Sequence, residues 1–204
     1  MKKVIFCLTL CVVALWGCKQ VDPVKTIENL HAAYIGESTA SAKYASFAKV
    51  AMEAGNNAVA VLFLTASKSE AIHAANHLKV LEGLGHKADQ VNPEYTPGDV
   101  LSNLRAALEG ESYEVATMYP EFIAAAKTEK VKKAVKSFNW AMDTEKKHMV
   151  FYENAIKALT DNTEAALPTG YAICPICGNT YDAAAVDDKC AFCQTPKKEF
   201  VIIQ

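Results

Sequence analysis

The sequence has no cysteine between residues 18 and 174, no basic patch or stripe, and no apolar run long enough to span a bilayer. The cysteine gap excludes a disulfide framework spread through a secreted domain. With a net charge of −2 and no basic cluster, the chain is not expected to bind nucleic acid. Its 204 residues, 51% of them hydrophobic and 22% charged, are enough for one ordinary domain followed by a small one.

The first residues have the pattern of an export signal. Lys2 and Lys3 precede the apolar run 4–16, which is shorter than the ~20 residues of a membrane-spanning helix but suits a signal peptide. The stretch Leu15-Trp-Gly-Cys18 resembles the lipobox of bacterial lipoproteins. That resemblance implies removal of residues 1–17, acylation of Cys18 and a lipid anchor in the periplasm or cell envelope. The alternative is an uncleaved N-terminal anchor, which also places the chain outside the cytoplasmic membrane.

Four long helical segments follow. Apolar periodicity and turn residues predict helices over 24–54, 58–84, about 97–127 with a kink at Pro120, and 128–160. Asp22 and Thr96 are the expected N-caps of the first and third. The proline-containing connection 86–97 is long enough to cross over, as in ferritin-like bundles. The fold class is therefore all-α, with a bundle over 18–165 and a small domain over 166–204, joined by a polar linker around 161–170.

Two Glu-x-x-His pairs mark the bundle, Glu70 with His73 and Glu145 with His148. Residues three apart share a helix face, so each pair directs a carboxylate and an imidazole to one point. Taken singly, each Glu could be an ordinary surface residue and each His a hydrogen-bonded core residue. However, these glutamates fall on apolar stripes together with three others, where uncompensated charge costs several kcal/mol each; the others are Glu37, Glu111 and Glu114. The pattern predicts two divalent cations, iron or manganese rather than copper or zinc.

The spacing of these residues also indicates a weak internal repeat. Glu37 and Glu70 are 33 residues apart, and Glu111 and Glu145 are 34 apart. We interpret this as two helical hairpins, each of which contributes one Glu and one Glu-x-x-His pair.

These stretches resemble the rubrerythrin family, over roughly Val24 to the C-terminus. The matching motifs are Gly36-Glu-Ser38 with Tyr44, Gly110-Glu-x-x-Glu114 with Met118-Tyr-Pro120, and the two Glu-x-x-His pairs. The resemblance implies seven iron ligands, with the glutamates at 70 and 145 bridging: Glu37, Glu70, His73, Glu111, Glu114, Glu145 and His148. It implies that Glu114 and His73 exchange on one iron as the redox state changes. It also implies that Tyr44 and Tyr119 hydrogen-bond ligand carboxylates; simple aromatic packing is the alternative.

The last four cysteines form two C-x₂-C pairs separated by twelve residues, Cys174 with Cys177 and Cys190 with Cys193. Two such knuckles deliver four thiolates in a tetrahedron, which fits zinc or one iron. In a rubrerythrin-like chain the segment is similar to rubredoxin, which favours iron, whereas a structural zinc ribbon is the alternative. Tyr171 and Phe200 are the aromatics expected to pack this domain. The second knuckle lacks the proline inside and the glycine after it that the family usually has.

The resemblance implies an oxidoreductase. The expected activity is a non-haem di-iron peroxidase that reduces hydrogen peroxide to water in oxidative stress defence, with electrons passed from a donor through the Cys₄ iron. A head-to-tail homodimer is implied, with the rubredoxin-like domain of one subunit near the di-iron site of the other. The alternatives are a ferritin-like ferroxidase that handles iron, and an electron-transfer or metal-binding lipoprotein whose bundle site is degenerate.

Overall fold

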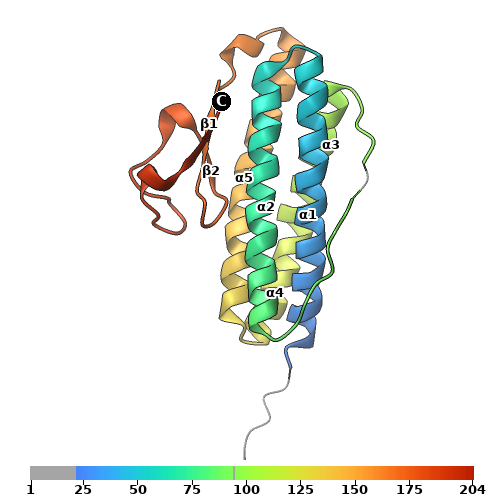
Figure 1. Cartoon of the computed structure of the whole chain (residues 1–204), viewed down its shortest axis with the longest axis vertical. Helices are drawn as coiled ribbons and strands as arrows, with labels where there is room; N and C mark the ends of the chain where they lie inside the picture. The colour runs from blue at the N-terminus through green and yellow to red at the C-terminus, as the bar shows by residue number, and fades with distance from the viewer. Residues whose placement is uncertain (1–21, 94) are drawn as a thin grey trace, which may run out of the picture.

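A computed structural model describes residues 22–93 and 95–204 (Figure 1). The predicted signal peptide, its cleavage site and the anchor at Cys18 lie outside these residues. Within the described ranges no helix combines the length and the apolar character that crossing a membrane requires.

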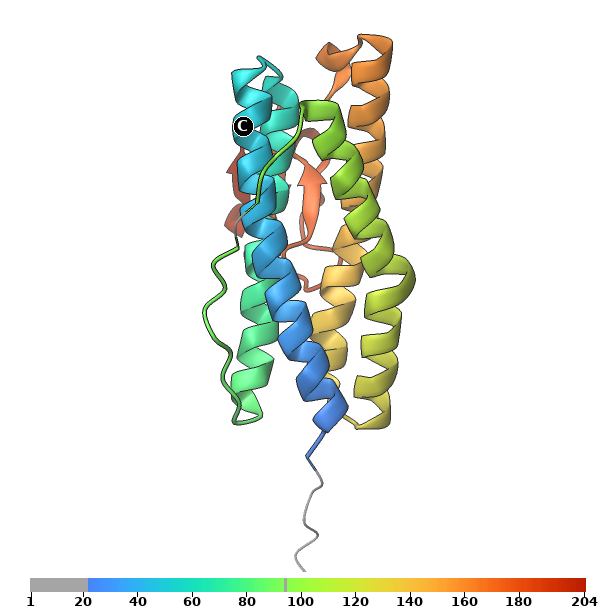
Figure 2. The ribbon, with the colours of Figure 1, turned by 90° about the vertical axis from the view of Figure 1, so that its right-hand side faces the viewer.

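Four long helical columns form the bundle, as predicted. The first hairpin consists of α1 (Val24–Glu53) and α2 (Asn57–Gly83), and the second of α3 (Val100–Tyr113) with its continuation α4 (Tyr119–Thr128), followed by α5 (Lys132–Asp161). The connection from α2 to α3 runs along the outside of α1, from one end of the bundle to the other (Figure 2). The ferritin-like topology with one long crossover is therefore confirmed.

The third column contains a π-helical turn, η1 (Glu114–Met118), directly before Pro120. Proline has no N–H to donate to the preceding turn, and a π turn accommodates one additional residue in a helix. The additional residue of the π turn explains why the spacing between corresponding residues is one longer in the second hairpin than in the first. Glu37 and Tyr44 are seven residues apart, whereas the equivalent Glu111 and Tyr119 are eight apart. The predicted kink is thus a one-residue insertion, which still places both tyrosines toward the centre of the bundle.

Two of the predicted helix caps are wrong. Asp99, not Thr96, caps α3, because its carboxylate accepts a hydrogen bond from the Ser102 N–H at 2.7 Å. The N-cap position of α1 is Pro23 rather than Asp22, and no side chain caps that end. The N-terminus of α1 is instead satisfied from a distant turn, where the Glu129 carboxylate accepts the backbone N–H of Thr26 at 2.7 Å.

The small C-terminal domain is a three-stranded antiparallel sheet with two metal-type knuckles. The strand order is β2 (Thr180–Asp182), β1 (Tyr171–Ile173), β3 (Val201–Ile203), and short helical turns lie at Glu164–Ala166, Ala183–Ala185 and Lys197–Glu199. Gly178 closes the first knuckle with a φ of 82°, and Gln194 closes the second with a φ of 65°. Gln194 thus takes the left-handed conformation that glycine usually provides, so the knuckle forms despite the missing glycine.

The two predicted aromatics of this domain have different roles. Phe200 packs within the domain, against Tyr181, with ring centroids 5.5 Å apart. Tyr171 instead packs edge-on against Phe151 of α5 at 5.1 Å and belongs to the bundle core. Its ring therefore joins the domain to the bundle, and the small domain lies beside α2 and α5 (Figure 1).

Candidate metal centres

Six of the seven predicted bundle ligands meet at the centre of the bundle, where each is at most 2% exposed. They form two groups of ligand atoms that lie within 4.8 Å of one another. These groups are Glu37, Glu70, His73, Glu145 and, second, Glu70, Glu111, Glu145, His148. The two glutamates of the Glu-x-x-His pairs belong to both groups, which is the arrangement that a bridged pair of ions requires.

The contacts of these two shared glutamates have bridging geometry. Glu70 directs one oxygen to His73 Nδ1 at 2.9 Å and the other to His148 Nδ1 at 3.1 Å. Glu145 does the same, at 2.9 Å to His73 and 2.8 Å to His148. Each carboxylate therefore spans the two imidazoles.

The same atoms have no properly aligned hydrogen bond among the described residues, although they are buried. Both oxygens of Glu70 and of Glu145 are unpaired in this sense, as are the Nδ1 atoms of His73 and His148 and Oε2 of Glu37. These oxygen and nitrogen atoms lie 2.8 to 3.1 Å from one another without mutual hydrogen bonds, so their lone pairs converge on points between them. Two cations at those points would satisfy all of them, so the donor set fits a di-metal pair.

Glu114, the seventh predicted ligand, lies at the edge of this cluster. It begins the π turn and is only partly buried, and it is in neither group of converging atoms. Burial and the neighbouring carboxylates of Glu145 and Glu70 raise its pKa, so it does lie close to the site. Its assignment as a ligand stays a prediction.

The two predicted tyrosines donate hydrogen bonds across the bundle. Tyr44 of the first hairpin donates to Glu111 Oε1 of the second at 2.7 Å. Tyr119 of the second hairpin donates to Glu37 Oε1 of the first in a short hydrogen bond. Each hairpin therefore fixes a carboxylate of the other hairpin by a hydrogen bond.

The site without metal holds protons that a metal would replace. Burial, followed by repulsion from neighbouring carboxylates, raises the pKa of Glu37 and Glu111. Burial opposes the charged form of His148, but the Glu70 and Glu145 carboxylates more than compensate and raise its pKa to about 10. The pKa of His73 is raised for the same reasons. Glu145 is the exception: burial acts against ionisation, yet His73 and His148 lower its pKa to about 2.

We therefore expect the metal-free protein to lose stability as pH rises from 6.5 to 9. The folded chain keeps protons on raised glutamates and histidines that the unfolded chain releases, so stability falls by about 1.4 kcal/mol per pH unit for each extra proton. Glu145 and His77, with pKa values lowered to about 2 and about 3, titrate below this window. Urea unfolding at several pH values measures the slope. In zinc-loaded protein the metal displaces these protons, so a slope equally steep there would contradict this account.

The four cysteine sulfurs form a second metal-type cluster. All lie within 4.8 Å of one another, with Cys174 and Cys193 3.3 Å apart and Cys177 and Cys190 3.4 Å apart. These distances far exceed the ~2.05 Å of a disulfide. They approach the spacing of a tetrathiolate tetrahedron with metal–sulfur bonds of ~2.3 Å. The thiols therefore fit one tetrahedral ion.

The small domain contacts both metal-site histidines of the same chain, through Gly178 of the first knuckle and Thr180 of β2. Ser69 of α2 donates to the Gly178 carbonyl at 2.8 Å, and His148 Nε2 lies 3.1 Å from Thr180 Oγ1. At Gly178 there is no room for a side chain, because an added Cβ would lie 2.3 Å from His73 Nε2. Lys147 of α5 reaches over to Asn179 Oδ1 at 2.6 Å. The resemblance led us to expect a partner subunit's domain in this place, whereas here the chain's own domain occupies it.

Several residues of the site are not prominent in the sequence. Ser69, Lys147 and Gly178 act through tertiary contacts, and nothing in local spacing identifies them. His77 carries a weak signal, because it lies one helical turn after His73 on the same face. Its ring contacts Tyr119, with Nε2 3.2 Å from the tyrosine oxygen.

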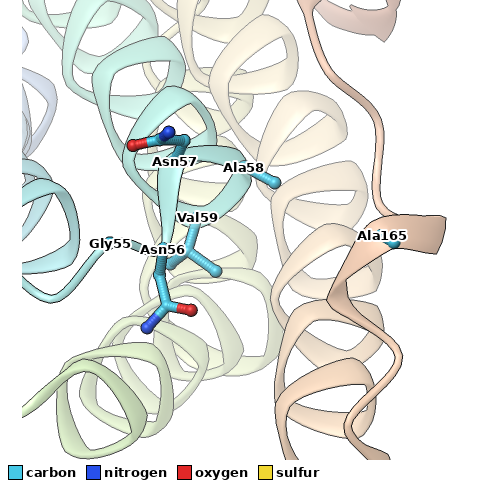
Figure 3. A pocket seen from close by; sticks show the side chains of 6 residues that line it. All are labelled: Gly55, Asn56, Asn57, Ala58, Val59 and Ala165. Carbon is cyan, nitrogen blue, oxygen red and sulfur yellow. The ribbon is translucent and has the colours of Figure 1, made fainter.

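One cavity on the surface lies at the turn between α1 and α2. The hollow at the α1–α2 turn is lined by small and amide side chains without a titratable group (Figure 3): Gly55, Asn56, Asn57, Ala58, Val59 and Ala165. It provides no donor set for a metal.

Comparison with known proteins supports the same architecture. The sequence model of the family described as Rubrerythrin matches residues 28–156. Among curated relatives, Rubrerythrin-2 of Clostridium acetobutylicum is 30% identical over 181 residues, which cover 88% of this chain and 97% of the relative. Nigerythrin of Nitratidesulfovibrio vulgaris is 33% identical over 183 residues, which cover 86% of this chain and 85% of the relative.

Solved structures agree with this comparison. The fully reduced, all-ferrous state of nigerythrin superposes with a TM-score of 0.78 at 33% identity, over 87% of this chain and 86% of that one. A bacterioferritin of Desulfovibrio desulfuricans superposes with a TM-score of 0.67 at 19% identity, over 85% and 98% of the two chains, which shows a common fold only.

Proposed function

The chain belongs to the rubrerythrin family, and on that premise we propose that it is a peroxidase that reduces hydrogen peroxide to water in oxidative stress defence. Its bundle cluster is a di-iron carboxylate–histidine site, and its four cysteines suit one iron. The observation that carries the proposal is the contact of the Cys₄ domain with both imidazoles of the di-iron site, with His73 through Gly178 and with His148 through Thr180, since it joins a one-electron carrier directly to the place where peroxide would react.

The iron pair, when bound and reduced, supplies the two electrons that cleave the O–O bond. The chain's residues position this chemistry. Glu70 and Glu145 would hold both ions, and the burial of the site would exclude bulk water. Tyr44 and Tyr119 fix the outer carboxylates by hydrogen bonds, so that the ligands need little reorganisation. Glu114, which begins the π turn, would approach or leave one ion as the redox state changes, as the family resemblance implies.

The small domain provides the route for refilling the site with electrons. Cys177 is followed directly by Gly178, whose backbone contacts His73. Lys147 secures the residues that follow this knuckle, by lying over the Tyr181 ring at 3.9 Å and by donating to Asn179. This docking favours a peroxidase with an attached electron relay over a ferroxidase that stores iron, because a storage site has no use for a carrier in contact with its ligands.

The proposal also covers the cellular location and the oligomeric state of the protein. We propose that residues 1–17 are removed and that Cys18 is acylated, which anchors the domain by lipid in the periplasm or cell envelope. We also propose a homodimer. Because the small domain docks beside the site of its own chain, the dimer would serve assembly rather than supply a missing part.

The decisive experiment uses the iron-loaded protein without residues 1–17. The protein is fully reduced under anaerobic conditions and mixed with hydrogen peroxide in a stopped-flow instrument. We expect about three irons per chain by elemental analysis, rapid oxidation of the bundle site, and two waters formed per peroxide. Sizing of the same sample should give a dimer. No reaction with peroxide, or a cage of many subunits, would contradict the assignment and favour iron storage.

A further inference from the structure

A line of buried polar side chains leads from the di-iron site toward the surface. It begins at Glu37 and passes through Tyr119 and His77 to Ser137 on α5. These residues come from four different helical columns, and each is at most 5% exposed. Apart from Glu37 and Tyr119, none of them is needed to explain metal binding.

The contacts are continuous. Tyr119 bonds to Glu37 Oε1, its oxygen lies 3.2 Å from His77 Nε2, and His77 Nδ1 lies 2.8 Å from Ser137 Oγ. The direct separation of His77 Nε2 from Glu37 Oε1 is 3.9 Å, too long for a hydrogen bond, so the tyrosine oxygen must link the two. Ser137 lines a surface depression of about 460 Å³, whose rim includes the exposed Lys79, Lys133 and Lys136.

The number of hydrogen atoms that each side chain can donate fixes the direction of these hydrogen bonds. Tyrosine has one O–H, and Tyr119 gives it to Glu37, so the tyrosine oxygen must accept from His77 Nε2. A neutral imidazole has one N–H; with it on Nε2, Nδ1 carries a lone pair and accepts from the Ser137 hydroxyl. Every donor therefore points inward, from the surface depression toward the Glu37 carboxylate.

We propose that Ser137, His77 and Tyr119 form a proton relay that delivers solvent protons to Glu37 during peroxide reduction. The inference rests on the proposed function, in which one peroxide, two electrons from the iron pair and two protons give two waters. In each delivery the Tyr119 O–H bond breaks and an O–H bond forms on Glu37 Oε1. In the same concerted step Tyr119 takes the Nε2 proton of His77, and Nδ1 takes the Ser137 proton, which solvent replaces, so none of these three residues has to carry a net charge. Glu37 passes its proton to an oxygen of the peroxide as it is reduced and becomes a carboxylate again. His77 is left with its proton on Nδ1, and it regains the Nε2 tautomer by proton exchange with solvent before the next delivery.

The other half of the repeat lacks such a path among the described residues. Tyr152 follows His148 by four residues, as His77 follows His73, so the two positions are equivalent. Tyr152 is fully buried in the apolar cluster, and its ring packs edge-on against Tyr44 at 5.8 Å. No hydrogen bond found in the described part of the chain connects its hydroxyl to the surface. The pair offers a matched control within one molecule.

The test compares His77→Phe with Tyr152→Phe in the iron-loaded, fully reduced protein. Phenylalanine fills the position of His77, whose ring lies 5.2 Å from Phe138 among aromatics, but it cannot carry a proton. General acid–base steps contribute ~10²–10⁴-fold, so we expect His77→Phe to slow peroxide oxidation of the bundle site ~10²-fold. The rate ratio between H₂O and D₂O should also rise, which packing damage alone would not cause. Tyr152→Phe should match wild type in both respects.

A second measurement does not depend on any variant. In zinc-loaded protein, which is diamagnetic, ¹⁵N NMR of His77 should show the proton on Nε2. A proton on Nδ1 would mean that the chain of donors points outward, and it would overturn the relay. Equal rates for wild type and His77→Phe would overturn it as well. If wild-type protein itself fails to react with peroxide, the proposed function is wrong. If wild-type protein reacts and His77→Phe reacts equally fast, only the relay is wrong.

Discussion

Glu70→Gln is expected to abolish the reaction with peroxide. Glu70 is 1% exposed and places one oxygen at each imidazole, so it is the residue on which both ions depend. Glutamine keeps the volume but replaces one oxygen by an N–H₂ group, which cannot ligate a cation and points its hydrogens at the site. We expect elemental analysis to fall from about three irons per chain to about one, retained by the cysteines. The rate of oxidation by peroxide should fall at least ~10³-fold.

The control for this change lies on the same helix. Glu82 is exposed near the end of α2, and Glu82→Gln alters charge by the same amount without touching the cluster. It should keep three irons and the wild-type rate. Full activity in Glu70→Gln would show that peroxide reacts elsewhere, whereas iron loss in both variants would indicate a general effect of charge on loading.

The metal cluster could be predicted from the sequence because helical periodicity fixes it. Glu70 with His73 and Glu145 with His148 each share a helix face regardless of tertiary detail, and several carboxylates on apolar stripes need cations beside them to be buried together. The crossover followed from the absence of any helical pattern between residues 86 and 97. The order of ligands along each helix was therefore contained in local sequence.

Other features depend on contacts between distant segments, which periodicity does not encode. The π turn before Pro120 arises because the second hairpin has one more residue than the first, and only the packed bundle shows where that residue is placed. In the sequence His77 is indistinguishable from an ordinary core histidine. Only the folded structure brings Ser137, 60 residues later, to its side chain. The docking of the small domain depends on Ser69 and Lys147. Their roles could not be predicted, because they depend on where the small domain packs against the bundle.

Gly178→Ala tests whether that docking is the route of electrons. The φ of Gly178 is 82°, and an added Cβ would lie 2.3 Å from His73 Nε2 and 3.2 Å from Ser69 Oγ. The backbone conformation is strained for a residue with a side chain, as at Gln194, and here the space beside His73 does not admit one. The four sulfurs remain together within the small domain, so the domain should keep its iron but move away from the bundle. A displacement of ~1 Å between reacting groups can cost ~10²-fold in rate.

The measurement separates the two steps of the reaction. Fully reduced protein is mixed with excess peroxide, and the thiolate-to-iron absorption of the Cys₄ centre is followed beside the signal of the bundle site. In Gly178→Ala we expect the bundle site to be oxidised at the wild-type rate, while the thiolate-to-iron absorption appears ~10²-fold more slowly. Gly83→Ala is the matched control, because a Cβ at Gly83, at the end of α2, meets nothing within 4 Å. An unchanged second step in Gly178→Ala would mean that electrons enter by another face, such as the domain of a partner subunit. A loss of bundle iron would mean that the added methyl group displaces the His73 side chain rather than the knuckle.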